Sequence, residues 1–245
     1  MVLRYTFFMD DIKIISAPTA ENPFVVLYKP AGLPSAPLDE SDSFNAFAKA
    51  AALFPELRAV CGKKDCEHGL LHRLDTATRG LLVIGATQEA YEVLILAQKS
   101  GLFEKTYTAT VDKNSKCLEG FPAFPIDKKN ALLGGKWCSI ESYFRPFGKK
   151  GACVRPVAEN SGMAAKKKCG KKIYRTKVLI AGNTATCKIS EGYRHQVRCH
   201  LAWAGFAVKG DELYNAQCTG GELCFEATSV QFPHPLSAKT VFFSV

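Results

Sequence analysis

The segment His72-Arg73-Leu74-Asp75-Thr76-Ala77-Thr78-Arg79-Gly80-Leu81-Leu82 is the most informative stretch of this chain. It places a single aspartate, Asp75, between an arginine and two threonines, and after Gly80 it enters an apolar run at 81–86 that predicts a buried strand. A carboxylate held where a loop enters a strand is well placed to act as a nucleophile. Taken alone, Asp75 would be better explained as a residue that only caps a turn, and neighbouring motifs are needed to favour the nucleophile.

Strands and helices follow one another around this segment without internal repeats. Hydrophobic patterns predict strands at residues 24–28, 81–86, 104–111, 177–180, 184–189 and 223–232, and helices at 43–54, 88–98 and 194–204. We expect an N-cap for the first helix within 41–43, Thr87 as the cap of the second, and Gly205 as the end of the third. Strands outnumber helices and do not alternate regularly with them. The pattern therefore predicts an α+β fold on a largely antiparallel mixed β-sheet flanked by helices.

Length and charge set outer limits. At 245 residues the chain could form one large domain or two small ones, and we expect a single domain over 1–245. Lysine and arginine exceed aspartate and glutamate by 32 to 23, which gives a net charge of +9. This surplus favours a polyanionic partner, although it is only a weak sign by itself. No apolar run is long enough to span a bilayer, and residues 1–9 are too short for a signal peptide. We therefore expect a cytoplasmic protein without membrane contact.

Ten cysteines need an explanation. They are spread over a long chain without an export signal, which favours reduced, mostly buried thiols. Cys61, Cys66, His68 and His72 could ligate zinc and stabilise an interaction protein. Their spacing departs from the two separated ligand pairs of structural zinc sites, so we predict no metal.

Three further motifs are considered together with the Asp75 segment. They are Lys29-Pro30-Ala31-Gly32, Lys105-Thr106-Tyr107-Thr108-Ala109-Thr110-Val111 and Arg194-His195-Gln196-Val197-Arg198. Together with HRLD at 72–75 they resemble the motifs of the RluA-type RNA pseudouridine synthases, over residues 25–237. Gly210-Asp211-Glu212-Leu213-Tyr214 and Phe232-Pro233-His234-Pro235 resemble two further segments of that family, which we interpret as structural supports.

The resemblance implies a pseudouridine-synthase-like catalytic domain, here without an N-terminal S4 domain. It implies isomerisation of specific uridines in ribosomal or transfer RNA after base flipping, with no cofactor. RNA is then the partner, and we expect a monomer without an obligate protein partner. In this family pattern the catalytic residues are Asp75, the nucleophile, Tyr107, which stacks on the flipped base, and Arg198, which pairs with the aspartate. Substrate-binding residues would be Arg73, His72, Thr78, Arg79, Lys29, Arg194, His195 and Gln196.

Two positions depart from the family pattern. The usual T-S-G is Thr78-Arg79-Gly80, and the usual G-R-x-H-Q is Gly192-Tyr193-Arg194-His195-Gln196, with the arginine moved by one place. These departures leave open an alternative, a catalytically inactive RNA-binding protein of the same fold. A glycosidase with two carboxylates is weaker, because no second acid lies in a recognisable partner motif.

A basic segment interrupts the readable pattern. From Arg145 to Lys177 the chain has eleven lysines and arginines against the single acid Glu159. We expect a flexible basic insertion at about 145–172. Two interpretations are equally open, a solvated charge run or a loop that contacts RNA phosphates, and they are compatible.

Overall fold

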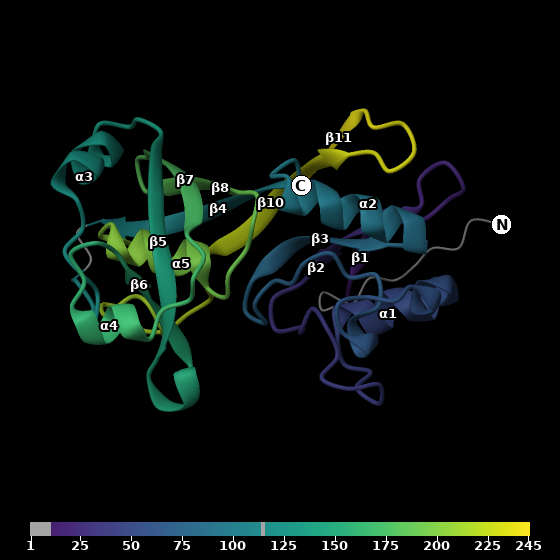
Figure 1. The fold of residues 1–245 in the computed structure, drawn as a ribbon, viewed down its shortest axis with the longest axis horizontal. Coiled ribbons are helices and arrows are strands. Elements are labelled where there is room, and N and C mark those ends of the chain that lie inside the picture. The colour runs from purple at the N-terminus through teal and green to yellow at the C-terminus, as the bar shows by residue number, and fades with distance from the viewer. Residues whose placement is uncertain (1–10, 114–115) are drawn as a thin grey trace. The chain divides into compact units, whose positions relative to one another are not determined.

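The structure is a computed structural model that describes residues 11–113 and 116–245. It contains two compact units: unit 1 comprises Met1–Phe103 and Ala227–Val245, and unit 2 comprises Glu104–Glu226 (Figure 1). The expectation that residues 1–9 are not a signal peptide lies outside the described residues. Within the described ranges, no helix has both the length and the apolar character needed to cross a membrane.

Unit 1 is built on a sheet with the strand order β1-β2-β3-β10-β11. These strands are β1 (Lys13–Ser16), β2 (Phe24–Lys29), β3 (Arg79–Gly85), β10 (Phe225–Pro233, which enters unit 1 at Ala227) and β11 (Thr240–Ser244). The pairs β1–β2, β2–β3 and β10–β11 are antiparallel. β2 and β3 are almost wholly buried, as their continuous apolar runs predict, and Lys29 lies opposite Gly80. The two motifs that contain these residues are thereby brought side by side.

The helices of unit 1 are α1 (Ala46–Leu53) and α2 (Gln88–Lys99), with 3-10 turns at Pro55–Ala59 and Asp65–Glu67. α2 packs through Tyr91 and Leu94 against apolar side chains of β2, β3 and β10. The predicted cap is confirmed, because Thr87 Oγ1 accepts the N–H of Ala90 at 3.2 Å.

The predicted cap of α1 within 41–43 is wrong. The helix starts later, and Asn45 Oδ1 accepts the N–H of Ala48 at 2.8 Å. The preceding residues form turns instead, because Asp39 and Asp42 accept the N–H groups of Ser41 and Phe44.

Unit 2 has an antiparallel sheet with the order β4-β8-β7-β5-β6, and β9 pairs with β4. Its strands are β4 (Glu104–Lys113), β5 (Cys138–Phe147), β6 (Cys153–Val157), β7 (Tyr174–Ala181), β8 (Thr184–Ile189) and β9 (Phe206–Val208). Its helices are α3 (Ile126–Leu133), α4 (Met163–Lys167) and α5 (Gln196–Trp203), with a 3-10 turn, η3, at Lys149–Gly151. The predicted α+β class with a largely antiparallel sheet is confirmed.

Two expectations for unit 2 need correction. The helix predicted at 194–204 begins at Gln196, because His195 adopts a left-handed conformation (φ 57°) that ends the loop before it. The insertion expected at 145–172 contains β6, all five residues of which are buried, as well as η3 and α4. Within this segment, β6 is therefore a buried strand of the sheet rather than a flexible insertion.

His200 anchors α5 in the core of unit 2. Its fully buried ring lies between the hydroxyls of Ser142 (3.0 Å from Nε2) and Thr176 (2.8 Å from Nδ1). Burial, together with the charge of Lys128, lowers the pKa of His200 to about 3, so the folded protein keeps this ring neutral.

The buried His200 makes unit 2 sensitive to acid. The unfolded chain binds a proton at this histidine near pH 6.5, whereas the folded chain does not until about pH 3. We expect the free energy of unfolding to fall by about 1.4 kcal/mol per pH unit from this one group as pH drops below 6.5. Urea unfolding of the wild type and of His200→Gln at pH 7 and pH 5 checks this. Equal pH slopes for the two proteins would contradict it.

Candidate active site

The Asp75 loop is a tight turn that enters β3. The Thr78 N–H donates to the Asp75 carbonyl at 2.9 Å, and Asp75 is half-buried. The residue before it is fixed from both sides, because the Ser35 hydroxyl donates to the Leu74 carbonyl (2.8 Å) and accepts the Leu74 N–H (2.9 Å). The loop therefore holds the Asp75 backbone in place at the start of a buried strand.

Lys29 ties this loop to the turn at 30–34. Its ammonium is fully buried and donates to the carbonyls of Pro30 (2.8 Å), Leu33 (2.7 Å) and Thr76 (3.2 Å). Burial lowers the pKa of Lys29 to about 8, and the negative charge of Asp75 opposes that shift. We predicted that Lys29 binds substrate. That role stays a prediction; in the structure its ammonium donates to three protein carbonyls, which support the loop.

Gly80 allows two backbones to approach closely. Its φ is +125°, and a Cβ placed there would lie 2.3 Å from the Ala227 carbonyl oxygen and 2.5 Å from the Ala227 nitrogen. This conformation and this contact both exclude a side chain. The glycine that follows the Asp75 loop is thus required by the packing of β3 against β10.

We expect Gly80→Ala to destabilise the protein by roughly 3 kcal/mol or more, since it combines a disfavoured φ with a backbone clash. The midpoint of thermal unfolding measures the effect. Gly182→Ala is a suitable comparison, because Gly182 also has a positive φ but no atom within 4 Å of the added carbon. A Gly80→Ala midpoint no lower than that of Gly182→Ala would contradict this account.

The other predicted residues of unit 1 surround the loop in different ways. Arg73 is exposed and forms an ion pair with Glu67 at 3.1 Å. His72 is half-buried, with its ring edge-on to Phe103 at 5.7 Å between centroids. The buried Thr78 hydroxyl has no hydrogen-bond partner among the described residues, and Arg79 is the first residue of β3.

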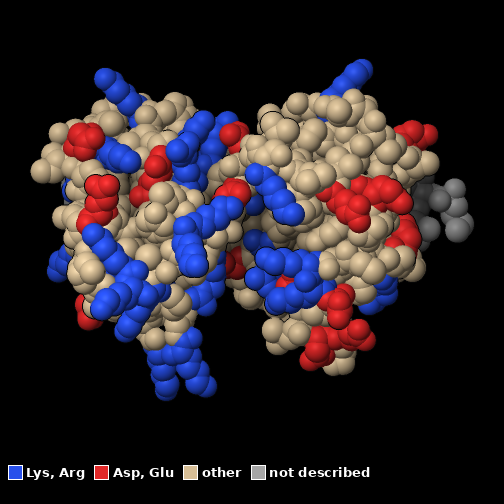
Figure 2. Space-filling model, in the orientation of Figure 1, with Lys and Arg blue, Asp and Glu red and all other residues tan. Residues whose placement is uncertain are grey.

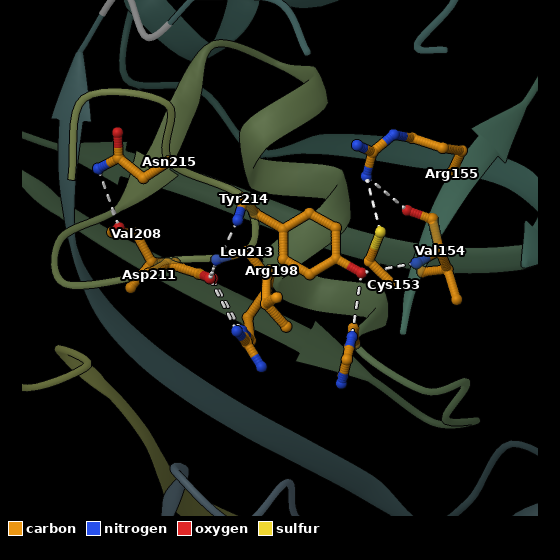
Figure 3. A network of polar contacts seen from close by, with 10 residues as sticks. Cys153, Val154, Arg155, Arg198, Val208, Asp211, Leu213, Tyr214 and Asn215 are labelled. Carbon is orange, nitrogen blue, oxygen red and sulfur yellow. Dashed lines mark hydrogen bonds and ion pairs between the residues drawn. The ribbon is translucent and has the colours of Figure 1, made fainter. Parts of the chain in front are cut away.

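Arg198 and Asp211 form the central ion pair of unit 2 (Figure 3). Nε and Nη2 of Arg198 each donate to a different carboxylate oxygen of Asp211 at 2.7 Å, and both side chains are buried. Asp211 also accepts the backbone N–H groups of Leu213 (3.0 Å) and Tyr214 (3.1 Å). A bidentate pair of this kind fixes the plane and direction of the guanidinium. The pairing of Arg198 with Asp75, which the family pattern implies, stays a prediction.

Tyr214 extends this network to β6 and to the residue before α5. Its hydroxyl accepts the Val154 N–H at 2.9 Å and lies 3.0 Å from Nδ1 of His195. Burial raises the pKa of Tyr214, so the phenol stays protonated. Arg198 packs over the Tyr214 ring at 5.4 Å. The motif at 210–214, which we predicted to be a structural support, thus positions both His195 and Arg198.

The side chains of Arg194 and Gln196 donate hydrogen bonds to backbone carbonyls near α5. Arg194 Nη2 donates to the carbonyls of Gly151 and Cys153, and Gln196 Nε2 donates to Arg175 O (2.9 Å) and to the Thr176 hydroxyl (3.1 Å). Gln196 is buried, and its Oε1 accepts the Tyr193 N–H at 2.9 Å. This arrangement gives Gln196 a structural role beside the one predicted for it.

Tyr107 lies on β4 and is mostly buried. Its ring stacks on Phe225 with 5.1 Å between centroids and an angle of 8° between planes. Parallel stacking on Phe225 fixes the plane of the phenol ring. Phe225 was not among the predicted site residues, and its only signal in the sequence is an aromatic at the start of a predicted strand.

Metal binding finds no support in the described residues. Within 11–113 and 116–245, no group of three or more His, Cys, Asp or Glu side chains is arranged to hold a metal ion. His68, one of the four residues considered for zinc, stacks on Phe47 at 5.0 Å.

The family described as RNA pseudouridylate synthase matches residues 23–203. The chain belongs to this family. The match contains Asp75, Tyr107 and Arg198, whereas Asp211 and Tyr214 lie after it. The resemblance to RluA-type members is confirmed by curated relatives of that type.

Two curated members of the pseudouridylate synthase family show how far the likeness extends. Ribosomal large subunit pseudouridine synthase D of Neisseria meningitidis is 25% identical over 236 residues, which cover 89% of this chain and 54% of the relative. Dual-specificity RNA pseudouridine synthase RluA of Pasteurella multocida is 25% identical over 226 residues, covering 90% of this chain and 88% of the relative. The chain spans 53% and 65% of the length of two Bacillus subtilis relatives, so it covers about half to two thirds of several members.

A solved structure shows the same fold. Human RNA Pseudouridylate Synthase Domain Containing 1 aligns with a TM-score of 0.61 at 16% sequence identity, covering 99% of this chain and 86% of that one. The likeness establishes the fold of the pseudouridylate synthases for this chain.

Proposed function

We propose that this chain converts specific uridines of structured RNA into pseudouridine. The observation that carries the proposal is the family match over residues 23–203, which contains the Asp75 loop and its lysine support. The basic character of the chain, with a net charge of +9, fits an RNA substrate. A curated relative whose name specifies the ribosomal large subunit supports ribosomal RNA as the substrate, and we propose transfer RNA as the other candidate.

Asp75 is the proposed nucleophile. A uridine leaves the RNA stack, which costs a few kcal/mol, and exposed Arg73 takes part in filling the space. Asp75 assists cleavage of the N1–C1′ bond, the uracil turns within the site, and C5 bonds to C1′. C5 then loses its proton and N1, released from C1′, takes one up, so that uridine and pseudouridine have the same composition. No redox change occurs in this sequence.

Arg198 is proposed to act on the nucleophile, and Tyr107 on the uracil base. Arg198, held by Asp211, is proposed to pair with the Asp75 carboxylate. Tyr107, whose ring plane is fixed by stacking on Phe225, is proposed to stack on the uracil and to place its hydroxyl for proton transfer at C5. His72, Thr78, Arg79, Arg194 and His195 are proposed to contact the RNA. We further propose a cytoplasmic monomer.

Mapping of pseudouridine in cells tests the proposal. RNA from cells with and without the gene is treated with carbodiimide, and primer-extension stops are compared, with complementation by the wild type or by Asp75→Asn. We expect one or a few stops to disappear without the gene and to return only with the wild type. An unchanged set of stops in ribosomal and transfer RNA would contradict it.

A further inference from the structure

Positive charge is concentrated in one of the two units. Unit 2 has 21 lysines and arginines against 11 acids, a net charge of +10, whereas unit 1 has 11 against 12, a net charge of −1. In Figure 2, lysine and arginine side chains gather over unit 2, including at the projecting end of the β5–β6 hairpin seen in Figure 1. The surplus that suits a polyanion therefore belongs to unit 2 alone.

The β5–β6 hairpin places two arginines directly opposite each other. Arg145 of β5 and Arg155 of β6 are cross-strand neighbours, and their guanidinium carbons lie 5.1 Å and 4.3 Å from the centroid of the same ring, Phe147. Like charges at directly opposite positions destabilise a sheet. In the described parts of the chain, neither arginine forms an ion pair with a carboxylate. This hairpin therefore bears an uncompensated charge.

Arg155 is held in a fixed orientation. Its side chain is buried, Nε donates to the Glu119 carbonyl at 2.7 Å, and Nη1 donates to the Val154 carbonyl at 3.1 Å. Arg145 has a buried Nε without a hydrogen-bond partner in the described residues. Arg155 is therefore a buried charge that carbonyls and aromatic rings hold in place, without a carboxylate partner among the described residues.

Three more cations surround the same hairpin. Lys149 and Lys150 are exposed on η3, and Lys150 has a positive φ of 52°, a conformation that a non-glycine residue adopts only at a cost. Arg194 donates to the carbonyls of Gly151 and Cys153 at the base of this turn. We call the set the hairpin cations: Arg145, Lys149, Lys150, Arg155 and Arg194.

Two other cations of unit 2 are already paired with carboxylates, and three more lie in an exposed run. Lys172 pairs with Glu191 at 2.6 Å, and Arg175 pairs with Glu141 at 2.9 Å. The lysines at 166–168 are exposed on or next to the short helix α4, where a solvated charge run is the ordinary outcome. The hairpin cations differ because two of them are rigid arginines that share one aromatic ring.

We propose that the hairpin cations form a binding surface for backbone phosphates of RNA, contacted through Arg145, Lys149, Lys150 and Arg194, while the buried Arg155 adds its charge beneath them. The inference rests on the proposed function, because it assigns the RNA contact of that enzyme to a defined part of unit 2. Guanidinium groups bind phosphate through paired N–H donors, and each neutralised phosphate releases counterions. The surface supplies affinity and orientation without reading bases.

Salt-dependent binding tests the surface without requiring turnover. A fluorescently labelled, uridine-containing RNA stem-loop is titrated with the full chain at several salt concentrations. The test variant combines Arg145→Gln, Lys149→Gln and Lys150→Gln, and the matched control combines Lys166→Gln, Lys167→Gln and Lys168→Gln. Both remove three charges from unit 2. Equal thermal midpoints establish that both variants fold.

The hairpin variant is expected to lower the slope of log affinity against log salt by about 2 to 3, and to lose roughly 100-fold in affinity near 0.1 M salt. The control variant is expected to change the slope by less than about 1. Equal losses in the two variants would overturn the proposal, since binding would then depend on overall charge. Displacement of the RNA by polyglutamate at equal charge would overturn it too, in favour of an acidic protein partner. If the hairpin variant bound RNA as tightly as the wild type and still formed pseudouridine, the surface would be rejected and the proposed function would stand.

Discussion

Asp75→Asn is expected to lower the single-turnover rate of pseudouridine formation by on the order of 10⁴-fold or more, because the amide is a poor nucleophile. The measurement is release of tritium from RNA labelled at uridine C5, with RNA from cells that lack the gene as substrate. The loop should keep the hydrogen bonds accepted by the backbone carbonyls of Asp75 and Thr76, because the substitution leaves both carbonyls in place.

The control for this loss is Asp65→Asn. Asp65 is an exposed acid in the 3-10 turn that precedes the motif, and its replacement removes the same charge from unit 1. We expect its rate to stay within about twofold of the wild type, as for an ordinary surface substitution. A rate for Asp75→Asn similar to that of Asp65→Asn would exclude Asp75 as the nucleophile and restore the interpretation of Asp75 as a turn residue.

Asp211→Ala is expected to destabilise the protein by about 3 to 5 kcal/mol, because it removes the bidentate partner of the buried Arg198 guanidinium. It also removes the acceptor for the N–H groups of Leu213 and Tyr214. Urea unfolding, followed by fluorescence, measures the free energy. We expect the rate of pseudouridine formation to fall as well, since Arg198 loses the contact that orients it.

An exposed ion pair provides the comparison for Asp211. Glu141 pairs with Arg175 at 2.9 Å, but the side chain of Arg175 is 64% exposed and that of Glu141 36%. Glu141→Ala should therefore change the free energy of unfolding by no more than about 1 kcal/mol. If Asp211→Ala cost as little as Glu141→Ala, the Arg198–Asp211 pair would not be the structural centre of unit 2.

The elements that sequence patterns predicted well are those with a continuous apolar run or a clear cap. β2 and β3 are buried on both faces and therefore read as uninterrupted hydrophobic strands. α2 combines an amphipathic pattern with a threonine cap at Thr87. Local chemistry decided these elements, so the sequence alone was sufficient.

The elements that sequence patterns missed depend on contacts with distant residues. β6 reads Cys-Val-Arg-Pro-Val, and a buried arginine and a proline both argue against a strand. Arg155 is tolerated there because the rings of Phe121 and Phe147 and the Glu119 carbonyl surround it. The sequence of β6 alone does not predict those partners.

The site shows the same division between local and distant information. The motifs indicated Asp75, Tyr107 and Arg198 as functional residues, but not what holds them. Lysine is rarely fully buried, so the enclosure of Lys29 by three carbonyls could not be expected from its type. Asp211 lies thirteen residues beyond Arg198, in a motif that seemed only structural, and the ion pair becomes evident only in the folded chain.

Conversion of uridine by the purified chain tests the central claim most directly. RNA from cells that lack the gene is incubated with the protein, digested to nucleosides and separated by chromatography. We predict that pseudouridine rises as uridine falls by the same amount, with no change in total nucleoside mass and no added cofactor. The same RNA incubated with Asp75→Asn should show no gain. Unchanged uridine and pseudouridine, with a folded protein that binds this RNA, would contradict the account.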